Sequence, residues 1–251
     1  MLVLAYGTHI FSCEPVHTVP HHCSTTPPPM FNAIHDWDQK CTHTISKRSL
    51  PAYLEIFLCY PGALLFGWVG MILIWPPVLY YLRGINGVIL LLSSAAIGQG
   101  INRLAKNIVQ RDRPTPPSPS PVRHFPVRVP DRHATGDGPS FPSGDSMAAG
   151  VVGATIYFIL ATGGSSSWSS PPQLAFLLTL WGMIGRMYYH CHYFLDTIFG
   201  AMIGIASSLT AQRMRLLEPA EFIIAVPLFI VWMSVSKSLA KMVRRVFIES
   251  S

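Results

Sequence analysis

Charged residues are scarce in this sequence. Of its 251 residues only 12% are Asp, Glu, Lys or Arg, whereas 50% are hydrophobic. A soluble globular domain carries about 25% charged residues. The shortage is uneven, because long uncharged runs alternate with short basic connectors. This pattern excludes a domain with a large polar surface and is typical of a chain that crosses a membrane several times.

Disulfide and metal frameworks are also lacking. The five cysteines form no evident disulfide pattern, and no Cys or His pair has zinc-site spacing beside a matching second pair. Histidines and cysteines gather in residues 1–50 together with Pro27–Pro29. Zinc binding there is an alternative, but the composition favours a disordered N-terminal extension over residues 1–50. Met1–Ile10 lacks the basic start and long apolar core of a signal peptide.

Apolar runs fill the rest of the chain. They predict an all-α, polytopic membrane helix bundle with about six transmembrane helices, which forms one domain over residues 51–251. The runs are Ile56–Leu82, Ile85–Ile101, Ser146–Thr162, Leu174–Gly185 (extended toward Tyr189), Phe194–Ala211 and Phe222–Val235. Several are shorter than the roughly 20 residues that a lone span prefers, but their small residues suit close helix packing in lipid. Pro61, Pro76 and Pro77 should kink the first run.

A proline-rich stretch over residues 112–140 interrupts the helical pattern. Eight prolines between Pro114 and Pro139 forbid a helix there, and Arg123, Arg128 and Arg132 make the stretch basic. One interpretation is a solvated linker. The other is a lid, or a surface that attracts anionic lipid headgroups.

Two cations precede this stretch. Lys106 and Arg113 are seven residues apart, close to two helical turns, so both should project from one face of a helix that continues the second run. Pro114 should end that helix at Arg113. Arginine binds a phosphate bidentately and lysine binds it as a point charge. The pair therefore predicts a phosphate clamp at the end of a span.

A helix start follows the proline-rich stretch. Pro142 fixes the entry of the chain, Ser143 can cap the helix, and Gly144 lets a backbone N–H approach an anion. An ordinary capped helix start would use the same residues. The positive end of a helix dipole nevertheless makes this position suitable for a phosphate.

A basic and acidic cluster lies between the fourth and fifth runs. Asp196 follows His192 by one helical turn, so it can accept the N–H of one imidazole nitrogen and leave the other nitrogen available as a nucleophile. Arg186 precedes them. The two earlier segments flank the loop between the second and third runs. The third run crosses the membrane and the fourth returns, so this cluster should meet the two earlier segments at one membrane face.

Jointly these segments resemble the type 2 phosphatidic acid phosphatase superfamily, which is related to the vanadium haloperoxidases. The matching pattern is K-x6-R-P, then P-S-G, then R-x5-H-x3-D, and it covers roughly residues 85–210; Phe141, Tyr188, Tyr193 and Gly200 match as well. The resemblance implies that the phosphate is bound by Lys106, Arg113 and Arg186, with Ser143 and Gly144 in the anion cradle. It further implies that His192 attacks phosphorus, that Asp196 orients His192, and that the phosphohistidine is hydrolysed without a metal or other cofactor.

Asp145 departs from the family pattern, in which a histidine at this position protonates the leaving oxygen. An aspartic acid can do so only if its pKa rises from about 3.9 toward the working pH, and neighbouring arginines oppose that. Three alternatives follow. Asp145 is a weak general acid, or Asp145 has no catalytic role, or the leaving group of the substrate needs little protonation. The last alternative favours an isoprenyl or polyprenyl diphosphate, whose leaving phosphate has a second pKa near 6. Gly185, where the family has serine, is a minor departure.

Two other functions remain open. One is a catalytically degenerate lipid-binding membrane protein. The other is a lipid phosphotransferase similar to the sphingolipid synthases, although the intact segment from Lys106 to Pro114 favours hydrolysis. The expected partners are a lipid phosphate or diphosphate substrate and membrane lipids, whereas the net charge of +6 fits membrane topology better than nucleic acid.

The expected location is the endoplasmic reticulum or another internal membrane. With six spans, both termini share the face of the site. That face carries Lys40, Lys47, Arg48, Lys237, Lys241, Arg244 and Arg245, and the opposite face carries Arg83, Arg213 and Arg215. The positive-inside rule makes the basic face cytosolic, although many members of the family act on the lumenal or outer side.

Overall fold

The computed structural model describes residues 29–67, 69–115, 121–125, 139–162 and 171–215, and within these ranges the fold is all-helical. The helices are α1 (Pro29–Ser46), α2 (Ala52–Leu54), α3 (Tyr60–Leu64), α4 (Trp75–Arg83), α5 (Ile85–Val109), α6 (Gly144–Thr162), α7 (Pro171–Tyr188) and α8 (Phe194–Arg215). Two π-helical turns, Glu55–Cys59 and Gly70–Ile74, join the shorter pieces. The predicted all-α membrane bundle is confirmed.

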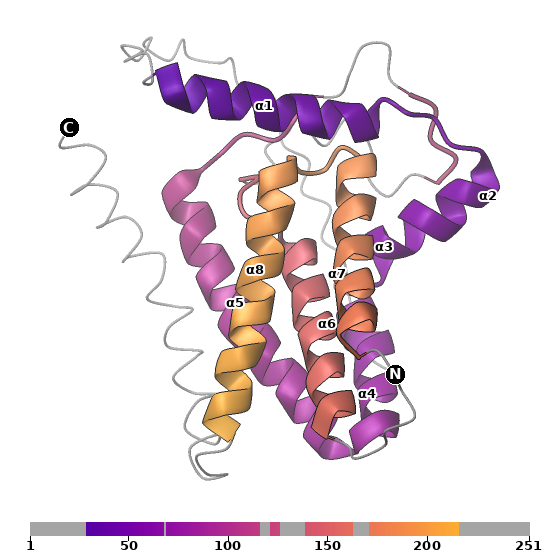
Figure 1. Cartoon of the computed structure of the whole chain (residues 1–251), viewed down its shortest axis with the longest axis vertical. Coiled ribbons are helices and arrows are strands. Elements are labelled where there is room, and N and C mark those ends of the chain that lie inside the picture. The colour runs from indigo at the N-terminus through magenta and orange to yellow at the C-terminus, as the bar shows by residue number, and fades with distance from the viewer. Residues whose placement is uncertain (1–28, 68, 116–120, 126–138, 163–170, 216–251) are drawn as a thin grey trace, which may run out of the picture.

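Helix α6 is the centre of the bundle and packs against α7, α8 and α5, and α5 packs against α8 as well (Figure 1). Its side chains Ala149, Val151 and Val152 are completely buried. The backbones of α6 and α8 touch directly, because a Cβ atom on Gly204 would lie only 2.0 Å from the carbonyl oxygen of Met147. Such contact between small residues is how helices associate in lipid.

Three of the described helices are long and apolar enough to cross a membrane: Ile85–Val109, Gly144–Ala161 and Phe194–Met214. They correspond to the second, third and fifth predicted runs, each extended by a few residues. The fourth run is α7, which begins at Pro171 and packs in the same bundle. The sixth run, Phe222–Val235, lies outside the described residues.

The first predicted run is not one continuous helix. Within Ile56–Leu82 the chain forms separate pieces, and each π-helical turn ends two residues before a proline, at Cys59 before Pro61 and at Ile74 before Pro76. A proline cannot donate to the carbonyl one turn earlier, and its ring clashes there, so the helix widens or breaks. The predicted effect of the prolines is confirmed, and it goes further than a kink, because the run is divided into separate pieces.

Helix α1 corrects the prediction of a disordered extension over residues 1–50, because residues 29–46 are helical; residues 1–28 lie outside the described part. Helix α1 runs across one end of the bundle (Figure 1). Its buried positions Asp38, Thr42 and Ser46 are four residues apart and completely inaccessible to solvent. The buried stripe is therefore polar, and a search for apolar periodicity does not detect it.

Candidate active site

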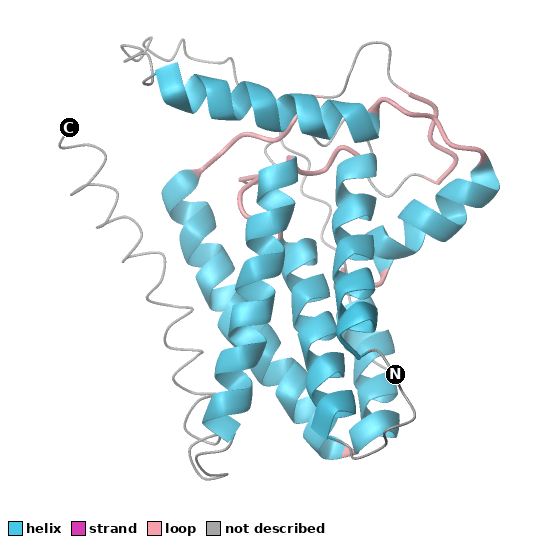
Figure 2. Ribbon diagram, in the orientation of Figure 1, coloured by secondary structure: helices cyan, strands magenta, loops and turns pink. Residues whose placement is uncertain are grey.

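His192 lies in the short connection between α7 and α8, at the end of the bundle that α1 covers (Figure 2). It precedes α8 by two residues and is 3% exposed. Its Nδ1 atom is 2.9 Å from the backbone oxygen of Ser140. Because a carbonyl only accepts hydrogen bonds, Nδ1 carries the proton and Nε2 carries the lone pair. The ring is thus held in the tautomer that a nucleophilic Nε2 needs.

Asp196 was expected to accept the N–H of the His192 imidazole, but in the structure the backbone carbonyl of Ser140 accepts it. The His192 Nδ1 atom is 3.8 Å from the nearer Asp196 oxygen, which is too long for a hydrogen bond. That oxygen accepts from the Ser140 hydroxyl and, at 3.0 Å, from the Tyr193 N–H. Asp196 therefore acts on His192 through its nearby charge and by holding the serine whose carbonyl accepts the imidazole proton.

Each predicted phosphate-binding cation contacts a loop that carries a site residue. The Lys106 Nζ donates to the carbonyl of Pro139 at 2.7 Å, one residue before Ser140. Arg113 donates to the carbonyl of Cys191 at 2.9 Å, one residue before His192. Arg186 is followed by a turn in which the N–H of Cys191 donates a hydrogen bond to the backbone carbonyl of Arg186 at 3.0 Å. The structure thus brings the three sequence segments to one end of the bundle.

The arginines also act on His192 electrostatically. Burial is the main reason that the pKa of His192 falls from 6.5 to about 4, and the charges of Arg186 and Arg113 lower it further against the raising effect of Asp196. The imidazole is consequently neutral near pH 7. A buried, neutral imidazole beside two arginines combines a nucleophile with an anion site.

Arg113 reaches this place by a different route from the one expected. Helix α5 ends at Val109, and Gln110 adopts a left-handed backbone with φ 47° while its N–H donates to the carbonyl of Lys106. Arg113 therefore lies in the loop beyond the helix, and the expectation that it shares a helical face with Lys106 is wrong. The helix stops four residues before Arg113 because of the left-handed turn, not because of Pro114.

The start of α6 has the capped form expected of Ser143 and Gly144. The Ser143 side-chain oxygen accepts the N–H of Ser146 at 3.3 Å, and the Ser143 N–H donates to the backbone oxygen of Asp196 at 2.9 Å. A Cβ atom on Gly144 would come within 4.0 Å only of the Asn102 amide oxygen. The backbone at this helix start therefore leaves space where an anion could approach.

Asp145 sits in the first turn of α6 and forms an ion pair with Arg186. Its Oδ2 is 2.6 Å from the Arg186 Nη2, with side-chain exposures of 26% and 12%. The residue that replaces the family histidine is thus bound to one of the predicted phosphate-binding arginines.

Three residues of this region were not identified from the sequence. Arg111 pairs with Asp196 at 2.8 Å and with Asp38 of α1 at 2.7 Å, and its guanidinium lies 3.9 Å from the centre of the Tyr193 ring. Ser140 is the third. Arg111 could have been noticed as a further cation in the K-x6-R-P segment, whereas nothing in the sequence connects Asp38 to residues more than 70 positions away.

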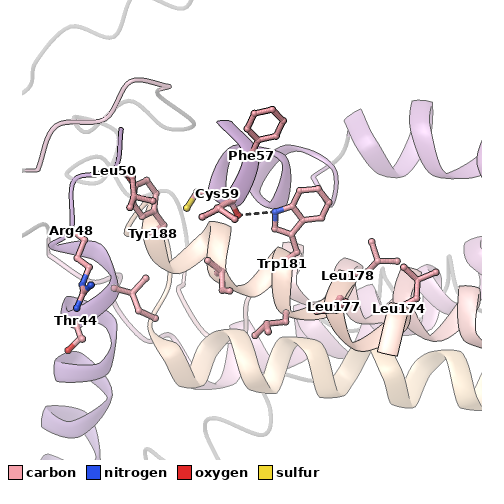
Figure 3. Close-up of a pocket in the computed structure, with 14 residues that line it drawn as sticks. Thr44, Arg48, Leu50, Phe57, Cys59, Leu174, Leu177, Leu178, Trp181 and Tyr188 are labelled. Carbon is pink, nitrogen blue, oxygen red and sulfur yellow. Dashed lines mark hydrogen bonds between the residues drawn. The ribbon is translucent and has the colours of Figure 1, made fainter. Parts of the chain in front are cut away.

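Two apolar grooves lie near the site. One, of about 330 Å³, adjoins Gly144 and Asp145 and continues along α5 and α6 past Leu92, Ala95 and Met147. The other, of about 710 Å³, runs beside α7, where the Trp181 indole donates to the Leu58 carbonyl at 2.9 Å (Figure 3). Ile184 and Tyr188 line this second groove, and Arg186, two residues from each, projects from the opposite face of the helix. Only the first groove meets the predicted phosphate-binding residues.

Comparisons with known proteins agree with this architecture. A family model described as the PAP2 superfamily matches residues 87–218. The crystal structure of LpxE from Aquifex aeolicus is similar with a TM-score of 0.51 and 20% identity, over 69% of this chain and 93% of that one. That of the first transmembrane PAP2-type phosphatidylglycerolphosphate phosphatase from Bacillus subtilis has a TM-score of 0.55 and 20% identity, over 73% and 87%. A search of curated proteins gives no significant match.

Proposed function

This chain belongs to the PAP2 superfamily, and on that premise we propose that it is an integral membrane phosphatase that hydrolyses a lipid diphosphate, or less readily a lipid monophosphate, through a phosphohistidine at His192. The observation that carries the proposal is the state of His192. Its Nδ1–H is bound to a backbone carbonyl, and its Nε2 keeps a lone pair in a buried place near two arginines. That arrangement supports nucleophilic attack on an anion.

The reaction has two steps. The Nε2 lone pair forms a bond to phosphorus while the bond from phosphorus to the leaving oxygen breaks, and Lys106, Arg113 and Arg186 compensate the charge on the phosphoryl oxygens. Water then attacks the phosphohistidine, releases inorganic phosphate and returns the electron pair to Nε2. These steps use only the side chains named.

The ion pair of Asp145 supports the preference for a diphosphate. To protonate a leaving oxygen the carboxyl would have to be neutral, and a neutral carboxyl gives up its ion pair with Arg186. A leaving phosphate departs without a proton far more readily than an alkoxide, because its second pKa is near 6. The apolar groove of about 330 Å³ that begins at Asp145 offers a place for an isoprenyl or polyprenyl chain.

The test compares isoprenyl monophosphate and diphosphate of one chain length as substrates of the purified protein in mixed micelles. We expect vanadate-sensitive phosphate release, faster from the diphosphate, that is lost in His192→Ala and retained in the control His124→Ala, whose residue is exposed. Clear preference for the monophosphate would reject the diphosphate assignment. Transfer of labelled phosphate to an acceptor lipid would instead identify a phosphotransferase, and absence of both products would identify a binding protein.

A further inference from the structure

Helix α1 places a polar face against the loop and helix that carry His192 and Asp196. Asp38, Thr42 and Ser46 are completely buried although α1 lies outside the bundle proper (Figure 1). Burying such groups is unfavourable unless each finds a partner. The partners of Asp38 and Thr42 therefore indicate what this helix does.

Two of these residues cap α8 from outside. The Asp38 Oδ1 accepts the N–H of Leu195 at 2.8 Å, and the Thr42 hydroxyl oxygen accepts the N–H of Phe194 at 2.9 Å. Phe194 and Leu195 begin α8, and the first N–H groups of a helix have no partner within it. Helix α1 thus supplies the cap for the helix on which Asp196 lies. Contacts of the Tyr193 and Phe194 rings with His35 and Trp37 hold the same junction.

The other oxygen of Asp38 continues into the site. Asp38 Oδ2 is paired with Arg111, whose second Nη atom is paired with Asp196, and Asp196 holds the Ser140 hydroxyl. The carbonyl of Ser140 in turn accepts the His192 imidazole proton. An unbroken series of polar contacts therefore links α1 to the imidazole.

The charges in this series matter as much as its geometry. Arg111 alone would neutralise Asp196, because the two groups are only 2.8 Å apart and Asp196 is completely buried. Asp38 adds a second negative charge, so the group of Asp38, Arg111 and Asp196 keeps a net charge of −1 beside His192. When Nε2 bonds to phosphorus, positive charge develops on an imidazole that retains its Nδ1 proton. A net negative group beside the ring stabilises that charge.

We propose that Asp38 is a positioning residue of the phosphatase, which acts through Arg111 to hold Asp196 in place and to preserve the negative charge that stabilises phosphorylated His192. This rests on the proposed function. Helix α1 is then an integral part of the active site. Because Asp38 contacts Arg111 and the start of α8, we expect it to affect the chemical step more than substrate binding.

The test is Asp38→Asn in the full-length protein. Asparagine keeps an oxygen that can accept the Leu195 N–H, but it removes the negative charge that pairs with Arg111. Hydrogen bonds to charged groups contribute about 1.5–3 kcal/mol, which corresponds to roughly a 10- to 100-fold change in rate. We expect kcat for a lipid diphosphate to fall by that factor while KM changes less than about twofold. The matched control is Asp36→Asn, on the exposed side of the same helix, which should match the wild type.

Arg111→Gln completes a double-mutant cycle that separates positioning from a general loss of stability. If Asp38 acts through Arg111, Asp38→Asn should cause no further loss of kcat in the Arg111→Gln background. Equal losses in both backgrounds, or an unchanged kcat in Asp38→Asn alone, would overturn the proposal. A lower thermal unfolding temperature with additive kinetic losses would count as the same negative outcome.

Failure of the hydrolase assignment gives a different result. If the wild type releases no phosphate from any lipid tested, the proposed function is wrong. The role of Asp38 is then tested by orthovanadate binding, because vanadate bonded to Nε2 places the same positive charge on the ring. Weaker vanadate binding in Asp38→Asn, with Asp36→Asn unaffected, would support the coupling to His192, and equal binding in both variants would reject it.

Discussion

Two carboxylate–arginine pairs lie near His192, and they differ in exposure. Asp145 and Arg186 are 2.6 Å apart, with side-chain exposures of 26% and 12%. Asp196 and Arg111 are 2.8 Å apart, with side-chain exposures of 0% and 19%, so the difference between the pairs lies in their carboxylates. An incoming phosphate can replace the carboxylate on an arginine of the open pair. The buried pair is instead fixed by the surrounding protein. In the proposed mechanism the first pair therefore exchanges ligands and the second supports His192.

The partners of the two carboxylates explain this difference. Asp196 accepts from the Ser140 hydroxyl and from the Tyr193 N–H as well as from Arg111. Removing one partner of a buried ion pair costs about 3–5 kcal/mol, because the remaining charge is left uncompensated. The Asp145 carboxylate keeps about a quarter of its surface exposed, so water weakens its pair with Arg186, which therefore contributes less than the pair of Asp196. Substitutions in the two pairs should differ accordingly.

Asp196→Asn should have the largest effect. The variant loses the charge that stabilises the imidazole. Its amide has only one acceptor oxygen, so Ser140 and Tyr193 on one side and Arg111 on the other can no longer both be satisfied, and the orientation of His192 suffers as well. By analogy with other buried aspartates behind a catalytic histidine, we expect kcat to fall roughly 10³- to 10⁴-fold with little change in KM. Steady-state kinetics on a lipid diphosphate, with thermal unfolding as the check on folding, tests this; a loss of less than tenfold would show that the buried pair does not support catalysis.

Asp145→His restores the residue that the family has at the open position. General acid catalysis contributes about 10²- to 10⁴-fold, so the variant should hydrolyse a lipid monophosphate about 100-fold faster than the wild type does. Turnover of the matching diphosphate, whose leaving group needs no proton, should change only a few-fold. Paired assays on the two lipids measure the difference. If neither rate increases, the site has been rebuilt around Asp145 and the missing acid is not what limits it.

The contrast between the pairs also bears on what the sequence could predict. His192, Asp196 and Arg186 are close in the chain, so their spacing alone pointed to one site. The support of Asp196 comes instead from Asp38, Arg111 and Ser140. Asp38 is 157 positions from Leu195, whose N–H its carboxylate accepts. No local pattern contains that contact. The residues that are close in the chain could be predicted from their spacing. The residues that support Asp196 could not, because only tertiary contacts bring them together.

Helices show the same division. The apolar runs predicted α5, α6 and α8 within a few residues, because lipid and a buried core both select apolar side chains. Helix α1 was missed because its buried face is polar, and the end of α5 was misplaced because Gln110, a residue without a strong preference for left-handed backbone, adopts it. Burial of polar residues is decided by their partners, which the sequence does not identify.

The pH dependence of kcat should reflect the burial of His192. In the proposed mechanism the neutral imidazole is the nucleophile. Burial, assisted by the charges of Arg186 and Arg113, lowers the pKa of His192 from 6.5 to about 4. Between pH 7 and pH 5 the imidazole then stays neutral, so kcat at saturating diphosphate should fall less than twofold, whereas a histidine of ordinary pKa would lose about 30-fold. A loss of activity centred near pH 6.5 would mean that His192 is exposed to water in the working enzyme.

Asp145→Asn should have the smallest effect. We expect it to tighten the binding of substrate and vanadate, whereas the other substitutions mainly change kcat. Without the carboxylate, Arg186 no longer has to exchange one anion for another when the phosphate binds. Asp145 is partly open to water, so its pair with Arg186 contributes on the order of 1 kcal/mol. KM for the diphosphate and the inhibition constant of vanadate should therefore both fall by a factor of about 5. The value of kcat should stay within twofold of the wild type.

A general change in charge near the site could lower KM in the same way, so Asp112→Asn is the matched control. Asp112 is exposed and lies in the basic loop next to Arg113, but it is not the partner of Arg186. If Asp145 competes with the phosphate for Arg186, only Asp145→Asn should tighten vanadate binding. Equal tightening in both variants would indicate simple electrostatics, and a large drop of kcat in Asp145→Asn would instead make Asp145 the proton donor, in which case the open pair must separate before the leaving group departs.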